Sequence, residues 1–254
     1  AIITRGEKLK EWLTLYKGAL QARDVLIVWN YLLEVNKEKS DSSSFSISEN
    51  FSRNLCFYGE KTPQQVIEKA KTFDAWWRSN RASLDRMTAL NLSIFYSPGT
   101  KIFSLPMEVC ELSNLQKLMV TNQCLNTLPE QIGQLSNLRE LDVSGNKLCS
   151  LPDVLGKLFY LLKLDLRHNK LTSLPDCIGK LSQLAELNLD SNQISALPET
   201  IGELTQLVSL RLSKNDLKTL PKSIGKMNSL QKLDLEENRI TILGEELGDL
   251  SNLE

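Results

Sequence analysis

Apolar residues in the second half of the chain follow a pattern that returns every 23 residues. Within each repeat, leucines alternate with polar residues over a few positions, as in Leu187-Asn188-Leu189. Alternation with a period of two predicts a short strand that buries its leucines on one face and exposes the residue between them. An Ile-Gly-x-Leu stretch precedes most of these strands and predicts a helical turn that packs against the same core.

Three other residue types keep the same spacing. A leucine-proline pair, an asparagine and a glycine each recur at intervals of 23 residues, which chance does not produce in three registered columns. The prolines are Pro106, Pro129, Pro152, Pro175, Pro198 and Pro221. The asparagines are Asn146, Asn169, Asn192, Asn215 and Asn238, and the glycines are Gly133, Gly156, Gly179, Gly202, Gly225 and Gly248.

Each column has a physical role. One repeat cannot cover its own inward leucines, so neighbouring repeats stack and share one core. The asparagine follows the strand where the chain turns, and its amide can donate to and accept from backbone groups that the strand leaves unpaired. Proline then begins the outer segment, because its fixed φ and missing N–H suit a turn without a donor partner. The columns therefore predict a solenoid.

The segment Leu-Pro-Glu-Thr-Ile-Gly-Glu-Leu-Thr-Gln-Leu at 197–207, together with the L-x-x-L-x-L-x-x-N-x-L motif, resembles the 23-residue leucine-rich-repeat class. That class occurs in intracellular scaffolds that bind Ras-like GTPases and in many bacterial and plant cytosolic proteins. The resemblance covers about 103–254 and implies an α/β horseshoe with a parallel concave sheet. It predicts the fold with high specificity and the partner with almost none.

Two domains are expected. Residues 1–89 form a helical N-terminal or capping domain, because all four tryptophans lie before residue 78 and the apolar spacing there is helical. A serine-rich linker is expected near 40–48, and a helix from Pro63 to about Ser79. Residues 90–254 form a degenerate capping repeat and about six 23-residue repeats. The array is expected to be truncated at its C-terminus, because the last repeat is unfinished.

A second resemblance concerns Trp76-Trp77, Arg86-Met87 and Leu90-Asn91-Leu92. They are similar to the helical lead-in of bacterial leucine-rich-repeat effectors. This implies an alternative function, in which the chain is the substrate-recognition region of a larger bacterial effector ubiquitin ligase. The same tryptophans are also explained as aromatics that cap the open end of the solenoid core.

Composition narrows the partners. The net charge is −1, from 30 basic and 31 acidic residues, so no global field attracts nucleic acid or anionic lipid. The longest apolar stretch of the first half, Val25 to Trp29, is too short for membrane insertion. Five cysteines without a C-x-x-C pair favour a reducing compartment. A cytoplasmic location is expected, or the host cytoplasm for a secreted effector.

Catalysis is not expected in this chain. His168 is its only histidine and has no nucleophile that the repeat would hold nearby. The acids Asp142 and Asp165 fall on adjacent rungs and are expected to be solvated. The sequence contains no phosphate loop, metal set or cofactor motif.

The partner is expected to be a protein, with a small GTPase and a ubiquitination substrate as the candidate classes and the oligomeric state open. Outward positions of the strands and the loops after them supply one candidate set: Lys163, Asp165, Arg167, His168, Asn188, Asp190, Arg211 and Lys214. The alternative is that these charges only pair across adjacent strands, for example Arg167 with Asp190.

A second candidate surface breaks two otherwise polar columns. Phe159 and Tyr160 replace serine, threonine, asparagine or glutamine, and Leu162 lies beside them. Clustered apolar groups with a polar rim often mark interaction sites, so these three residues are predicted to anchor a partner or a second copy of the chain. Local repacking within the chain is the alternative.

Overall fold

The structure is a computed structural model that describes Asp24 and residues 77–82, 84–93 and 101–254. It divides into two compact units, one of residues 1–84 and 95–106 and one of residues 85–94 and 107–254. The expected serine-rich linker and all but the end of the helix expected from Pro63 lie outside the described residues. The helical nature of residues 1–89 as a whole stays a prediction.

The first unit is described only in part. Residues 77–82 are helical, Trp77 is buried, and the Arg81 guanidinium lies 5.9 Å from the centroid of its ring. The Asp24 carboxylate accepts hydrogen bonds from the backbone nitrogens of Phe103 and Ser104, at 3.2 and 2.8 Å.

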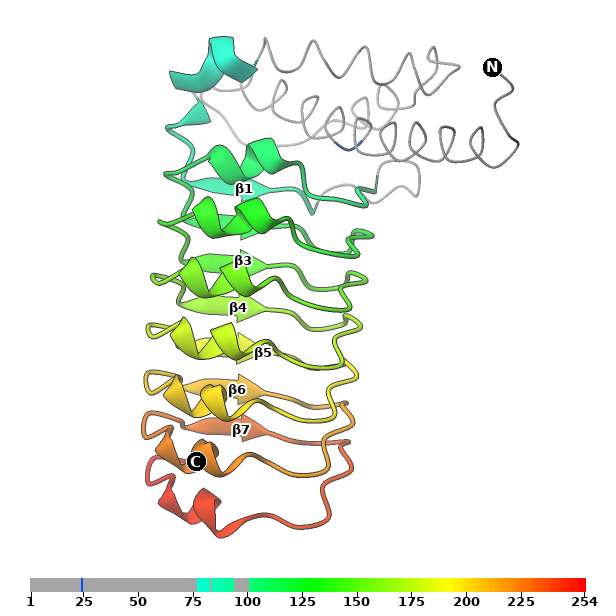
Figure 1. Ribbon diagram of the computed structural model, residues 1–254, viewed down its shortest axis with the longest axis vertical. Coiled ribbons are helices and arrows are strands. Elements are labelled where there is room, and N and C mark those ends of the chain that lie inside the picture. The colour runs from blue at the N-terminus through cyan, green and yellow to red at the C-terminus, as the bar shows by residue number, and fades with distance from the viewer. Residues whose placement is uncertain (1–23, 25–76, 83, 94–100) are drawn as a thin grey trace, which may run out of the picture. The chain divides into compact units, whose positions relative to one another are not determined.

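The second unit is built on a parallel seven-stranded sheet whose strands follow one another in chain order. Its strands are β1 (Ala89–Asn91), β2 (Lys117–Met119), β3 (Glu140–Asp142), β4 (Lys163–Asp165), β5 (Glu186–Asn188), β6 (Ser209–Arg211) and β7 (Lys232–Asp234). Equivalent positions pair in register, for example Leu141 with Leu164. The capping repeat expected from residue 90 therefore contributes a strand, β1, and Figure 1 shows the arrows stacked one above another.

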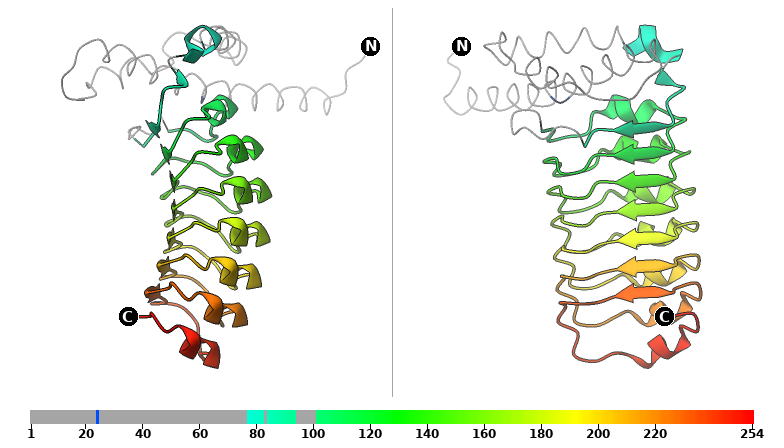
Figure 2. Two further views of the ribbon diagram at one scale, coloured as in Figure 1. Left: turned by 90° about the vertical axis from the view of Figure 1, so that its left-hand side faces the viewer. Right: turned by 180° about the vertical axis from the view of Figure 1, so that it is seen from behind.

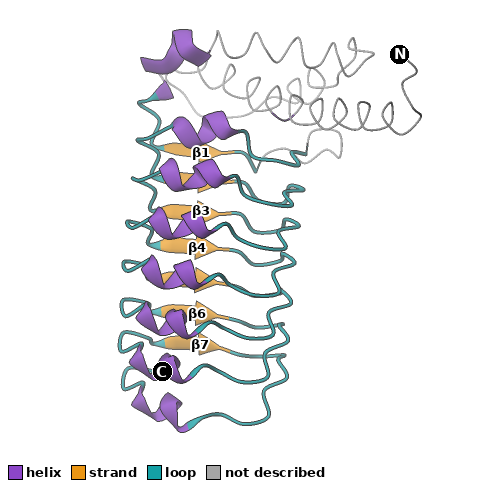
Figure 3. Ribbon diagram, in the orientation of Figure 1, coloured by secondary structure: helices purple, strands orange, loops and turns teal. Residues whose placement is uncertain are grey.

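Short 3-10 helices lie on the side away from the sheet (Figure 3). They are η2 (Met107–Glu111), η3 (Glu130–Gln134), η4 (Asp153–Lys157), η5 (Asp176–Lys180), η6 (Glu199–Glu203), η7 (Lys222–Lys226) and η8 (Glu245–Asp249). In the left view of Figure 2 strands and helices form two separate rows. Six of the helices, η2 to η7, follow a proline, such as Pro198 with φ −70° before η6. The predicted helical turns are confirmed, and a 3-10 helix suits a turn of this length.

The core lies between the two rows. The central leucines of β2 to β6 are at most 1% exposed, which confirms the inward assignment of that column. The asparagine column forms the predicted ladder. Asn192 donates from Nδ2 to the carbonyls of Leu166 and Leu189, both at 3.0 Å, and its Oδ1 accepts the Leu171 N–H at 3.0 Å. Stacking thus satisfies backbone groups that the short strands leave unpaired.

One column takes a conformation that the sequence did not suggest. The residue before each ladder position has φ between 51° and 68°, although only one of the six is glycine. They are Asn122, Gly145, His168, Ser191, Lys214 and Glu237. The left-handed turn lets the N–H of this residue reach the next repeat, as from His168 to the Asp190 carbonyl at 2.9 Å. The inter-repeat bond therefore offsets a conformation that costs a non-glycine residue about 1 kcal/mol.

Candidate protein-binding face

The exposed side of the sheet is hollowed at its centre. Side chains of five adjacent strands, β2 to β6, line a depression of about 210 Å³. Four predicted site residues contribute to it, namely Lys163, Asp165, Asn188 and Arg211. The remaining polar lining comes from Lys117, Glu140, Asp142, Glu186 and Ser209. We call this surface the sheet face.

The first outward positions of β2 to β5 carry charges that pair with a neighbouring strand. Lys117 Nζ lies 2.6 Å from Glu140 Oε2, and Lys163 Nζ lies 2.8 Å from Glu186 Oε1. The hydrogen bond that Lys163 donates to Glu186 raises the pKa of Lys163 above its ordinary value. These side chains are about half exposed, so each pair contributes little to stability. The alternative interpretation, that these charges pair across adjacent strands, holds at Lys163, which is not a free cation.

The second outward position has a structural role that sequence reasoning missed. The side-chain oxygens of Asp142, Asp165, Asn188 and Asp234 each accept the N–H of the residue two positions later, at 3.0 to 3.2 Å. The expectation that Asp142 and Asp165 are simply solvated is therefore wrong. The side chain of Asp165 is only 25% exposed. Burial raises its pKa, the nearby Asp142 and Asp190 raise it further, and the Arg167 N–H lowers it.

Asp190 was expected to point outward and is buried, 9% exposed. The cause lies in the next strand, where Arg211 occupies the position that a short Asp or Asn side chain holds in most repeats. Asp190 supplies the missing acceptor, because its Oδ1 accepts the Ser213 N–H at 2.8 Å while its Oδ2 lies 2.7 Å from Arg211 Nε. The absence of an Asp or Asn at 211 is the sequence signal that could have predicted this burial.

Strand β2 also lacks an Asp or Asn at its second outward position, which is Met119. Met119 cannot accept a hydrogen bond in this geometry, and the Thr121 N–H instead reaches Ser93 Oγ at 2.9 Å. Ser93 and Asp190 occupy equivalent positions, each two residues after the second outward residue of its strand. Where the second outward residue is not Asp or Asn, the preceding repeat thus supplies the acceptor.

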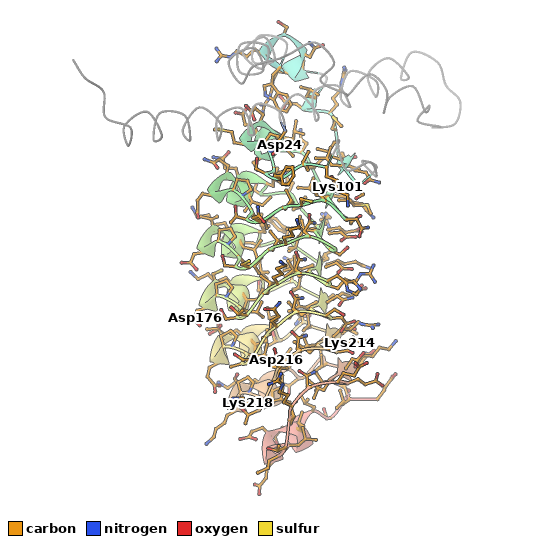
Figure 4. The ribbon with its side chains drawn as sticks, turned by 90° about the vertical axis from the view of Figure 1, so that its right-hand side faces the viewer. Asp24, Lys101, Asp176, Lys214, Asp216 and Lys218 are labelled. Atoms are coloured by element: carbon orange, nitrogen blue, oxygen red, sulfur yellow. The ribbon has the colours of Figure 1, made fainter. Side chains whose placement is uncertain are left out.

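The remaining charged candidates lie beyond the strand ends. Arg167 Nε lies 3.3 Å from Asp165 Oδ2 in its own repeat, so the expected pairing of Arg167 with Asp190 is wrong. Lys214 Nζ lies 3.4 Å from Glu237 Oε1. His168 is exposed on its left-handed turn. Figure 4 shows Lys214 on the strand side, opposite Asp176 on the helix side.

The aromatic candidates form a separate surface. Phe159 and Tyr160 are 54% and 52% exposed, in the turn between η4 and β4, and Leu162 is half-buried beside them. None of the three lines the depression of the sheet face. Their exposure fits the predicted anchoring role, which stays a prediction.

The described part of the chain holds no group of three or more His, Cys, Asp or Glu side chains that could bind a metal ion. Burial raises the pKa of the Cys110 thiol to about 12 and also raises that of Cys177, so both thiols stay protonated at neutral pH. None of the helices described is both long and apolar enough to cross a bilayer.

Comparison with known proteins agrees with this geometry. The model of the leucine-rich repeat region matches residues 152–254, and a single leucine-rich repeat model matches 137–158. No curated protein sequence matches significantly. An internalin from Listeria monocytogenes is 26% identical, with a TM-score of 0.57, over 68% of this chain and 48% of its own. The PEPR1-AtPEP1 structure is 30% identical, with a TM-score of 0.53, over 64% and 26%.

A leucine-rich-repeat protein of Leptospira interrogans is 36% identical, with a TM-score of 0.49, over 60% of this chain and 45% of its own. The chain thus spans less than half the length of each of these three proteins. Stacked parallel strands, 3-10 turns, the asparagine ladder and the matching models together identify the second unit as a leucine-rich-repeat solenoid.

Proposed function

We propose that the sheet face binds a protein partner and that the chain acts as a non-catalytic scaffold or adaptor. The observation that carries the proposal is the depression of about 210 Å³, lined by polar side chains from five strands. Parallel strands present these side chains as a broad array, which suits a folded surface or an extended segment of another protein. The PEPR1-AtPEP1 structure, which is similar over 64% of this chain, pairs PEPR1 with AtPEP1, and this supports a protein ligand.

The charges of the sheet face indicate what the partner presents. Asp142 and Asp165 are paired in register on β3 and β4, and the raised pKa of Asp165 records burial and repulsion by its acidic neighbours. A lysine or arginine from a partner would relieve that repulsion, because a cation beside a carboxylate favours its ionised form. The partner is therefore proposed to place a cation over Asp142 and Asp165.

Two finer expectations about the partner are also proposals. A small GTPase is one candidate partner, and a substrate of a bacterial effector ubiquitin ligase is the other. No specific observation favours the ligase alternative, and the cytoplasmic location also stays a prediction.

A photo-crosslinking experiment tests the sheet face. Ser209 lines the depression without an ion pair of its own, so p-benzoylphenylalanine at 209 would report a bound partner. The same residue at Asp176, on η5 at the opposite side, is the matched control (Figure 4). We expect one protein to crosslink at 209 and not at 176, and mass spectrometry then identifies it.

Affinity measurements with that purified protein complete the test. Asp142→Asn with Asp165→Asn keeps both backbone hydrogen bonds and removes both charges, so we expect binding to weaken about tenfold. Equal crosslinking at 176, or unchanged affinity of the double variant, would refute the proposal.

A further inference from the structure

The solenoid carries a second cluster of charges, on the segments that lead into β3, β4 and β5. Arg139, Lys157 and Lys180 are exposed there. None forms an ion pair within the described residues, whereas Lys117, Lys163 and Arg211 of the sheet face all do. The segments 134–139, 157–162 and 180–185 form what we call the entry edge, because each runs into a strand.

The lysine side chains lie along the preceding repeat. Lys180 Cδ is 3.3 Å from the point that a β-carbon on Gly156 would occupy, and Lys157 Cδ is 3.4 Å from the same point on Gly133. The glycine column thus leaves room for each lysine stem to cross a neighbouring 3-10 helix. Lys180 therefore extends toward the repeat that contains Phe159 and Tyr160. Beyond it the column changes sign, because Glu203 occupies the next position.

The backbone holds Phe159 and Tyr160 out of the core. Leu158 and Leu161 flank them and are fully buried. The Leu158 N–H donates to Leu155 O, and the Leu161 N–H donates to Leu158 O, both at 3.0 Å. The two leucines fill the inward places of this turn, so the aromatic rings between them must project outward.

Tyr160 lacks a contact that asparagines make at this position. The Asn137 amide donates to Ser113 O at 2.8 Å and the Asn252 amide donates to Asn228 O at 2.6 Å, whereas Gln183, Gln206 and Ser229 form no such bond within the described residues. A tyrosine has no amide that could make this bond to the preceding repeat.

We propose that the entry edge is a docking site for an acidic segment of a partner protein, one that carries an aromatic or aliphatic side chain. Phe159 and Tyr160 would contact the apolar side chain, and Arg139, Lys157 and Lys180 would contact the carboxylates. Charge complementarity favours this occupant over a second copy of the same edge. A two-fold interface would bring the same three cations of both copies together. The proposal concerns a different surface from the sheet face and stands independently of it.

The probe for the test is a fluorescein-labelled 12-residue peptide of glutamates around one phenylalanine. Its matched controls replace the phenylalanine with serine, or every glutamate with lysine, and a 12-nucleotide oligouridine tests for nucleic acid. Fluorescence anisotropy measures the binding of each probe to the full chain. We expect the first peptide to bind best and its affinity to fall as salt concentration rises.

Variants assign the binding to the entry edge. We expect the Phe159→Ser/Tyr160→Ser variant to bind the peptide about tenfold more weakly. Arg139→Gln/Lys157→Gln/Lys180→Gln should weaken it by a similar factor and remove most of the salt dependence. Lys218→Gln/Lys222→Gln, which changes exposed lysines elsewhere, and Asp142→Asn/Asp165→Asn should leave the affinity unchanged. Circular dichroism checks that every variant is folded.

Four results would overturn the proposal: no binding of the acidic peptide to the wild-type chain, tighter binding of oligouridine than of the peptide, equal binding to the aromatic variant, or conversion of a dimer into a monomer by that variant. Light scattering after size exclusion measures the last. The sheet-face proposal is tested with a different ligand and different variants. Its refutation would therefore leave the peptide result at the entry edge unchanged.

Discussion

The asparagine ladder makes a prediction about non-additivity. Each bridging carbonyl accepts from two successive asparagines: Leu166 O accepts from Asn169 Nδ2 at 2.9 Å and from Asn192 Nδ2 at 3.0 Å. Asn192→Ala therefore leaves that carbonyl one donor, and it leaves the buried Leu171 N–H without its acceptor. Losing the acceptor costs about 1–3 kcal/mol, and each weakened carbonyl costs roughly 0.5–1 kcal/mol. We expect Asn192→Ala to lower the free energy of unfolding by about 3 kcal/mol.

The double variant Asn169→Ala/Asn192→Ala removes both donors of Leu166 O. We expect it to be less stable than the sum of the single variants by about 1–2 kcal/mol, because a buried carbonyl then has no side-chain donor. Asn146→Ala/Asn192→Ala is the matched control. Asn146 donates to Val120 O and Val143 O, which Asn192 does not contact, so its effects should add within about 0.5 kcal/mol.

Urea unfolding followed by far-UV circular dichroism measures these free energies. Tryptophan fluorescence is unsuitable, because all four tryptophans precede residue 78 and lie outside the repeats. Equal m values across the variants are the check that the same region unfolds. Additive effects of the Asn169 and Asn192 substitutions would refute the shared-carbonyl reasoning, and so would equal coupling in the control pair.

Three further predictions concern single columns. The pKa of Asp165 is raised in the folded chain, so between pH 3.8 and that pKa the native chain binds more protons than the unfolded chain. The free energy of unfolding therefore falls as pH rises through this window. In urea unfolding we expect Asp165→Asn to be more stable than wild type at pH 7 and equally stable at about pH 3. In the same assay Asp190→Ala should cost about 2 kcal/mol, because the Ser213 N–H loses its acceptor. Adding Arg211→Asn to that variant should restore most of the lost stability by supplying a new acceptor. If stability is not restored, the preceding repeat does not act as the substitute acceptor. Lys214→Gly should raise the melting temperature, because glycine adopts the positive φ of this position without strain. Gly145→Ala should lower the melting temperature by the equivalent of about 1–2 kcal/mol, because the added β-carbon would meet Asn122 Oδ1.

Repetition made much of the fold predictable. Leucine, proline, asparagine and glycine recur at fixed positions in most repeats, so a single strand such as Leu187-Asn188-Leu189 predicted the inward and outward sides of the others. The candidate site was less predictable. Lys163, Asp165, Asn188 and Arg211 do meet in the depression, but Asp190 was expected on the surface and is buried beneath Arg211.

The left-handed column was missed for a similar reason. Gly145, Asn122 and His168 are of types that occur at positive φ, while serine, lysine and glutamate at the other positions give no local signal for it. The conformation is stabilised by a hydrogen bond to a carbonyl of the next repeat, 22 residues further along the chain, and not by the residue itself.

The sequence by itself determined the solenoid, its register, its ladder and the two irregular aromatics, because these depend on residue type at a fixed position within the period. Tertiary structure alone decided which charges are available on the surface. Arg167 pairs with Asp165 within its own repeat, while Asp190 is held by Arg211 and by the Ser213 N–H. Such choices depend on which backbone donor lacks an acceptor in the neighbouring repeat, and that is known only once the repeats are stacked.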